Sequence, residues 1–345
     1  MNIKIERVLA AAPLAAALLV LTACKGSSTG GIIAGPTPPP ASGSIYLTDS
    51  TTNGVGQPID QVLVFPQNAN GGPVPAQDIT GTSTGLSVPE GIAVDRSGNM
   101  WVTNSNTSSI TEYNAGATGN VAPINTVQGG ATLLSAPVGI AFDATGDLFV
   151  VNSQTDGSGQ YDLLEFGPNP TGNQGPINRI VGAATLLNQP QYVTVDNAGN
   201  VYVTNIASNL INIYGPGASG NVAPIVSFGG NCAAPDGIAL DTANNIYVSC
   251  DQFYEIREYS ALSGTNIPTQ IRSLGVNSSQ PQLYNPSGVA VNSLGTLFVA
   301  NTGLSGQAFG YVSVYAPNFS NTTGAGAFIG GGNSNVFRPG GIALH

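Results

Sequence analysis

Hydrophobic and polar residues alternate along the chain in short runs that recur at a nearly constant interval. In one copy a Pro-Glu-Gly triplet leads into the apolar run Ile92–Val94, a tight turn follows Asp95, and Met100–Asn104 forms a second run. The leading proline recurs at spacings of 48, 53, 45 and 51 residues, as Pro89, Pro137, Pro190, Pro235 and Pro286. An all-β repeat of roughly 50 residues is typical of the blade of a β-propeller.

The two ends of the chain supply the parts of a further blade. Pro339 opens another first-strand segment, Gly340–Leu344, and no outer strands follow it. Near the other end, Ser44–Asp49 fits the second strand, Val62–Phe65 the third and Val74–Thr80 the fourth. Closing a blade with strands from both termini removes the open sheet edges. We therefore predict an all-β, six-bladed propeller over residues 44–345, as one domain.

Residue types that occur once per blade are predicted to be structural. An aromatic residue in the second and third strands of each blade is expected to pack between neighbouring sheets. Aspartates that follow the first strand, such as Asp95 and Asp143, are interpreted as hairpin-turn residues rather than calcium ligands. A polar residue also ends most second strands, where we expect it to cap a turn and to give one face a polar rim: Asp49, Asn104, Asn152, Asn205 and Asn301.

The amino-terminal segment has the features of an export signal. Residues 1–23 combine a short basic start with an apolar run that is too short to span a membrane. The sequence Leu21-Thr22-Ala23-Cys24 resembles the bacterial lipobox, which implies lipidation of Cys24. Residues 24–43, rich in Gly, Ser and Pro, are predicted to form a tether. Lys25 after the cysteine favours the outer membrane, so we expect a lipid-anchored protein of the bacterial cell envelope.

The charge balance excludes one class of partner. From Cys24 onward the chain carries six basic and 17 acidic side chains, and only one of the six is a lysine. Nucleic-acid binding requires clustered Lys and Arg. We therefore expect no nucleic-acid partner, membrane contact only through the lipid, and a monomeric propeller.

The two remaining cysteines are predicted to form a disulfide. Cys232 precedes the first strand of one blade and Cys250 ends the second strand of the same blade. Adjacent antiparallel strands place both positions on one face, and a disulfide is expected outside the cytoplasm. Two free buried thiols are the alternative.

The residue after each leading proline is predicted to line one mouth of the central channel. Two of the six are acids, Glu90 and Asp236, which the blade order places on opposite sides of the axis. Next to Gln191, Tyr192 replaces the repeated glycine, and its phenol is expected to narrow the mouth. The channel-mouth residues Glu90, Gln191, Tyr192 and Asp236 are our candidate binding site. The alternative is that they are polar side chains at a solvated entrance.

The repeat resembles NHL repeats over essentially Ser44–Leu344, through its Pro-x-Gly-Ile-Ala-Val-Asp and Tyr-Val-Thr-Asn segments. The phrase Gly-Asn-Val-Ala-Pro, at 119–123 and 220–224, is similar to that of bacterial NHL-type lipoproteins. This resemblance implies a binding module for protein, peptide or carbohydrate.

A second, more distant resemblance concerns six-bladed propeller enzymes. In the gluconolactonase-like family, a Glu before Gly and an Asp in Pro-Asp-Gly bind a divalent metal, and Glu90 and Asp236 match those local motifs. The family's inner-ring asparagine ligands have no counterpart among Val138, Gln191 and Ser287, and the separation of the two acids in blades differs. The related streptogramin lyase family relies on a histidine, whereas the only histidine of this chain is His345.

We therefore predict a non-catalytic binding module without a cofactor. Two alternatives stay open: a metal-dependent lactonase or hydrolase that uses Glu90 and Asp236, and a structural envelope protein without a discrete ligand.

Overall fold

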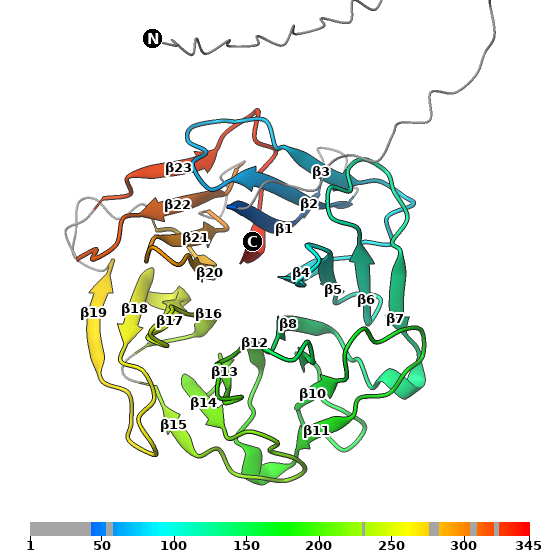
Figure 1. Cartoon of the computed structure of the whole chain (residues 1–345), viewed down its shortest axis with the longest axis vertical. Helices are drawn as coiled ribbons and strands as arrows, with labels where there is room; N and C mark the ends of the chain where they lie inside the picture. The colour runs from blue at the N-terminus through cyan, green and yellow to red at the C-terminus, as the bar shows by residue number, and fades with distance from the viewer. Residues whose placement is uncertain (1–42, 53–57, 230–231, 276–282, 304–308, 321–323) are drawn as a thin grey trace, which may run out of the picture. The chain divides into compact units, whose positions relative to one another are not determined.

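Six four-stranded antiparallel sheets surround a central axis, and the innermost strand of each sheet is the one that begins with a repeated proline (Figure 1). The computed structural model describes residues 43–52, 58–229, 232–275, 283–303, 309–320 and 324–345. Each described strand is short and alternates between the two sheet faces, as the sequence pattern predicts. The all-β, six-bladed propeller is confirmed.

Every sheet runs outward from an inner strand that begins with one of the repeated prolines. From the innermost to the outermost strand, the first three sheets contain β24 (Pro339–Leu344), β1 (Ser44–Thr52), β2 (Pro58–Pro66) and β3 (Gln77–Thr80); β4 (Pro89–Val94), β5 (Met100–Asn104), β6 (Ser109–Tyr113) and β7 (Asn125–Gln128); and β8 (Pro137–Phe142), β9 (Leu148–Asn152), β10 (Asp162–Phe166) and β11 (Asn178–Val181). The last three contain, in the same order, β12 (Pro190–Val195), β13 (Val201–Asn205), β14 (Leu210–Tyr214) and β15 (Val226–Phe228); β16 (Pro235–Leu240), β17 (Ile246–Cys250), β18 (Glu255–Tyr259) and β19 (Gln270–Leu274); and β20 (Pro286–Val291), β21 (Leu297–Asn301), β22 (Tyr311–Tyr315) and β23 (Ala327–Gly330). Short 3-10 turns span Gly130–Thr132, Ala183–Thr185 and Asp251–Phe253.

One sheet is assembled from both ends of the chain, as predicted. Strand β24 pairs with β1, with Ile45 opposite Leu344 and Leu47 opposite Ile342. The outer strand β3 begins at Gln77, later than the expected Val74. The difference has a simple cause: Pro73 and Pro75 offer no backbone N–H to a ladder, and Val74 is exposed.

The repeated aromatic residues fill the spaces between neighbouring sheets. Trp101 of β5 is buried and packs with Leu148, Val150 and Phe166 of the next sheet. Its indole meets the ring of Phe142 edge-on, with centroids 5.8 Å apart. The predicted packing role is therefore confirmed, and these rings offer no exposed platform.

Close contact between inner strands explains the repeated glycine. Thr103 accepts a hydrogen bond from the backbone N–H of Gly91 (2.8 Å) and donates one to the carbonyl of Val138 on the next inner strand (2.6 Å). A Cβ on Gly91 would overlap that same carbonyl oxygen. The corresponding glycines of four other inner strands meet backbone in the same way: Gly139, Gly237, Gly288 and Gly341.

The predicted disulfide between Cys232 and Cys250 is present, with the two Cα atoms 5.1 Å apart. Cys250 ends β17, at the position that an asparagine occupies in other sheets. In the second sheet, Asn104 there accepts a hydrogen bond from the backbone N–H of Ser87, in the loop before β4. The disulfide thus makes covalently a link that other blades make with an amide. It supports an extracytoplasmic location for the domain.

The predicted signal peptide, the lipidation site Cys24 and the tether up to residue 42 lie outside the described residues. Within the described ranges, no helix has the length and apolarity needed to cross a membrane.

Candidate functional site at the channel mouth

The start of the six inner strands forms one mouth of the central channel, with a cavity of about 360 Å³. Strands β4, β12 and β16 bring the four candidate residues, Glu90, Gln191, Tyr192 and Asp236, to this one cavity. The other residues after the leading prolines line it as well: Val138, Ser287 and Gly340. The predicted ring of mouth residues is therefore present.

The opposite end of the channel is a second cavity of about 320 Å³, and the residues that line it have almost exclusively apolar side chains; we call it the apolar end. Each inner strand contributes three consecutive residues, and one of the three is Ile or Val at the same position of every strand: Ile92, Ile140, Val193, Ile238, Val289 and Ile342. Tyr192 lines both cavities and also packs against the hydrophobic core between the fourth and fifth sheets.

Glu90 lies in the mouth on β4. Its carboxyl group is surrounded by protein, and this burial raises its pKa to about 7, against the opposing effect of the Arg338 charge and with a smaller upward effect of Asp60. The backbone carbonyl of Glu90 is fixed by a hydrogen bond from Thr48 (2.5 Å). The strand therefore holds the side chain at the mouth while its carboxyl group remains partly protonated near neutral pH.

Asp236 lies on β16, three blades from Glu90 in either direction around the ring. Burial raises the pKa of its carboxyl group to about 8, and the nearby charges of Asp251 and Glu90 contribute to this rise. Thr204 fixes the Asp236 carbonyl with a hydrogen bond of 2.6 Å. The negative charge of Glu90 thus acts on Asp236 across the channel. The two acids lie on opposite sides of the axis, as predicted.

Tyr192 stands where five inner strands carry glycine. Its backbone N–H donates to Thr204 at 3.0 Å, so the bridging contact of the repeat is kept. Burial raises the pKa of the phenol well above its usual value, with contributions from the charges of Asp236 and Glu90. The phenol therefore stays neutral and lies near both acids, where it offers a donor and an acceptor.

Arg338 is a mouth residue that the sequence analysis missed. In the other five blades the residue before the leading proline has a φ near +50°: Val88, Ala136, Gln189, Ala234 and Asn285. Arg338 does not share that conformation, and its N–H instead donates to Asp49 at 3.1 Å. Its side chain lines the cavity. The available signal was its charge, which is unique at this position of the repeat.

The side chains of the site are open to a ligand. Within the described ranges, the side chains of Glu90, Gln191, Tyr192 and Asp236 have no hydrogen-bond partner in the protein, and Ser50 and Thr302 also line the cavity. Polar groups in a concave site of this size are typical of small-ligand sites. Among the described residues, no three His, Cys, Asp or Glu side chains gather so as to hold a metal ion.

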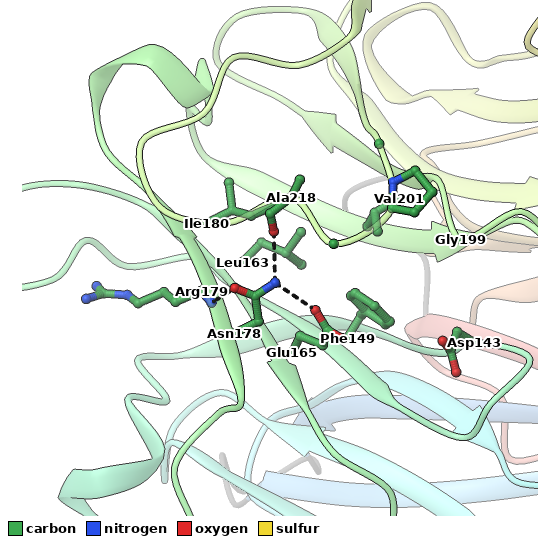
Figure 2. A pocket seen from close by; sticks show the side chains of 13 residues that line it. Asp143, Phe149, Leu163, Glu165, Asn178, Arg179, Ile180, Gly199, Val201 and Ala218 are labelled. Carbon is green, nitrogen blue, oxygen red and sulfur yellow. Dashed lines mark hydrogen bonds between the residues drawn. The ribbon is translucent and has the colours of Figure 1, made fainter. Parts of the chain in front are cut away.

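A smaller cavity of about 130 Å³ lies between the third and fourth sheets, away from the channel (Figure 2). Asn178 crosses it, because its amide donates to Glu165 at 3.0 Å and to the carbonyl of Ala218 at 2.9 Å. The bond to Ala218 joins the third sheet to the fourth, and the bond to Glu165 holds the amide within its own sheet, so we assign the cavity a structural role.

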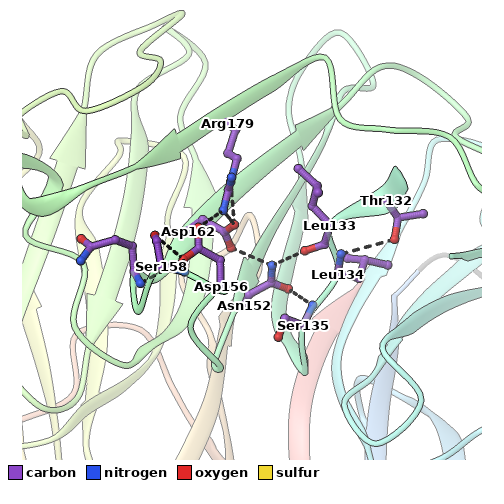
Figure 3. A network of polar contacts seen from close by, with 10 residues as sticks. Thr132, Leu133, Leu134, Ser135, Asn152, Asp156, Ser158, Asp162 and Arg179 are labelled. Atoms are coloured by element: carbon purple, nitrogen blue, oxygen red, sulfur yellow. Dashed lines mark hydrogen bonds and ion pairs between the residues drawn. The ribbon is translucent and has the colours of Figure 1, made fainter. Parts of the chain in front are cut away.

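The expected polar rim is wrong. The side chains at the ends of the second strands are buried rather than exposed, with 0% exposure for Asp49, Asn104, Asn152, Asn205 and Asn301. Asn152 illustrates the reason (Figure 3): it accepts from the N–H of Ser135 (2.9 Å) and donates to Asp162 (2.7 Å), which is paired with Arg179. The predicted capping role is confirmed, and it consumes the groups that a ligand would need.

Comparison with known proteins supports the fold. The sequence matches no protein-family model and no curated protein sequence. A Bacteroides caccae protein of unknown function has a similar structure, with a TM-score of 0.62 at 11% identity over 87% of this chain and 97% of that one. A putative 6-phosphogluconolactonase from Bacteroides uniformis has a TM-score of 0.52 at 12% identity, over 81% and 80% of the two chains. A Lactobacillus plantarum protein has a TM-score of 0.53 at 11% identity, over 87% and 98%. The distant similarity to lactonase-like propellers thus holds at the level of fold, which many functions share.

Proposed function

We propose that the propeller is a non-catalytic binding module of the cell envelope that takes a protein, peptide or carbohydrate group at its channel mouth. The carrying observation is the cavity itself, in which four residues of the predicted mouth present side chains without partners among the described residues. Elsewhere on the same inner strands, the repeat explains each residue by packing or by a backbone contact. A proposed lipid on Cys24 would hold the domain at the outer membrane, and the disulfide is consistent with that compartment.

The rival function is a metal-dependent lactonase, because Glu90 and Asp236 share the cavity. Two carboxyl groups alone are fewer than the ligands a divalent metal usually takes from a protein. Both acids also have raised pKa values, so that binding a metal must first displace protons.

Thermal unfolding of the full-length protein separates the two functions. We expect Ca²⁺, Mg²⁺, Mn²⁺ and Zn²⁺ to leave Tm within about 1 °C of its value in chelator. A resident metal at a hundred times its Kd would add about 2.7 kcal/mol and raise Tm by several degrees. A rise that disappears in Glu90→Gln/Asp236→Asn, together with lactone hydrolysis, would overturn the binding module.

The binding function itself is tested by recovery of envelope peptides and glycans on immobilised protein. We expect the wild type and the control Asp147→Asn, an acid-to-amide change in the hairpin at the other end of the strands, to retain the same ligand. Glu90→Gln/Asp236→Asn is expected to lose it. Equal recovery by all three proteins would place binding elsewhere.

A further inference from the structure

Acidic groups outnumber basic ones at the channel mouth. Glu90 and Asp236 line the cavity. The negative charge of Asp60 raises the pKa of Glu90, and that of Asp251 raises the pKa of Asp236. Among the described residues, the only basic side chain that lines this cavity is Arg338. Such an excess attracts a cationic group and raises its local concentration.

Three oxygen-bearing side chains come from two adjacent inner strands. Gln191 and Tyr192 are consecutive on β12, and Asp236 lies on β16, the next inner strand. Tyr192 and Asp236 both line the mouth cavity, as does Gln191. Within the described part of the chain, none of the three side chains has a protein partner. A primary ammonium group has three donors and no acceptor, which complements this set.

Tyr192 also lies where the inner strands approach one another most closely. Gly139, at the same position of the preceding inner strand, approaches the neighbouring backbone so closely that a Cβ would overlap Tyr192 itself. Tyr192 itself lines both cavities, so this residue forms part of the wall where the mouth cavity and the second cavity adjoin.

From these observations we propose that the mouth cavity binds a primary ammonium group. Asp236, Gln191 and Tyr192 accept its hydrogen bonds, and Glu90 adds a second negative charge. This inference rests on the proposed binding function and specifies its ligand chemistry. The ammonium group of a peptide lysine and that of an amino sugar offer the same donors.

Binding of a cation at this site is coupled to proton release. The pKa values of Asp236 and Glu90, about 8 and about 7, mean that both carboxyl groups hold protons at mildly acidic pH. The charges that act on them are those of Asp251, Asp60 and Arg338, and the phenol of Tyr192 remains neutral. An ammonium group lowers both pKa values, so its affinity rises with pH until the two acids are ionised.

The test is calorimetric titration of full-length protein with Nα-acetyl-lysine methylamide, whose amine stays charged between about pH 6 and pH 8.5. We expect affinity to rise at least tenfold over that range, with proton release seen as a dependence of the heat on buffer. Asp236→Asn is expected to lose at least tenfold in affinity at about pH 8.5, and Tyr192→Phe less. Asp147→Asn, the matched control, is expected to bind as the wild type does.

Two further probes at about pH 7 identify the source of the amine and challenge the inference. Glucosamine that binds more tightly than the lysine derivative assigns the amine to a sugar, and the reverse assigns it to a peptide. N-acetylglucosamine binding as tightly as glucosamine, with loss in Asp236→Asn, would overturn the ammonium inference and leave the binding module intact. Absence of binding by every probe and by envelope material would overturn both.

Discussion

The two ends of the central channel are built from the same six strands and yet differ in kind. At the apolar end every strand supplies Ile or Val at one position. At the mouth, two residues earlier, the six strands supply six different residues: Glu90, Val138, Gln191, Asp236, Ser287 and Gly340. Uniformity marks the end where neighbouring sheets must interlock. At the mouth, Val138 and Ser287 are buried, whereas Glu90, Gln191 and Asp236 line the cavity without a hydrogen-bond partner among the described residues, so they are the ones available for recognition.

We expect the largest effect from a side chain placed where the inner strands touch. Gly91→Ala puts a Cβ onto the carbonyl oxygen of Val138, and backbone cannot move aside as a flexible side chain can. We expect a loss of about 4 kcal/mol in the free energy of unfolding, at the upper end of overpacking effects, measured by urea denaturation. Gly340→Ala is the control at the mouth, because its Cβ would stand 3.5 Å from the nearest atoms. A loss there of similar size would show that the mouth is packed as tightly as the ring.

We expect a somewhat smaller loss of stability when the disulfide between Cys232 and Cys250 is removed. Cys232 and Cys250 are separated by 18 residues, and loss of a disulfide over such a loop costs about 3 kcal/mol in the chain-entropy model. We expect Cys232→Ser/Cys250→Ala to lose this amount in urea denaturation. Cys232→Ser/Cys250→Asn restores the asparagine of other blades and is expected to recover about 1 kcal/mol, the contribution of a typical hydrogen bond. Wild-type stability that is unchanged by reductant would contradict the prediction.

The stability of the protein is expected to depend on pH through the acids of the mouth. The folded-state pKa of Asp236, about 8, lies above its ordinary value of 3.8. Between these values the folded protein holds a proton that the unfolded chain has lost, so stability falls as pH rises from about 4 to above 8. Asp236→Asn removes this penalty. We expect the free energy of unfolding of the variant to exceed that of the wild type by on the order of 2 kcal/mol above pH 8. The difference should shrink towards zero near pH 4.

For the hairpin aspartate Asp143 we expect the opposite dependence of stability on pH. Burial acts to raise the pKa of Asp143, but hydrogen bonds from Thr145 and from backbone N–H groups lower it overall. Its contribution to stability is present above its ordinary pKa and is lost as pH falls through the lowered value. Thermal unfolding of Asp143→Asn should therefore show a loss at neutral pH that shrinks in acid. A stability curve of Asp236→Asn that parallels this one would show that the mouth acid is paired rather than desolvated.

The sequence was sufficient for those features that repeat. Six copies of one pattern determine the inner strand and the aromatic packing, and four of them determine the turn aspartates, because each copy satisfies the same steric requirement. The pairing of β1 with β24 followed from counting incomplete copies. The disulfide followed from antiparallel geometry, in which Pro235 lies opposite Cys250.

The sequence was less informative where a side chain has a choice of surroundings. Asparagines at strand ends were expected to be capping and exposed, yet Asn104 is enclosed by the loop that it binds. Arg338 escaped notice because its place in the mouth depends on a backbone that departs from the left-handed conformation of the other blades. The raised pKa values of Glu90 and Asp236 likewise arise from the depth of the channel, which residue types alone do not specify.

Closure of the ring by β24 has a consequence for synthesis. Strand β1 is made early and remains without its inner neighbour until residues some 300 positions later have been translated, since Ile45 pairs with Leu344. A contact so distant in sequence forms slowly. During that interval, the edge of β1 is equally complementary to the last strand of another newly made chain. Refolding at high concentration is therefore expected to yield molecules linked by exchanged strands, and dilution is expected to favour closed rings.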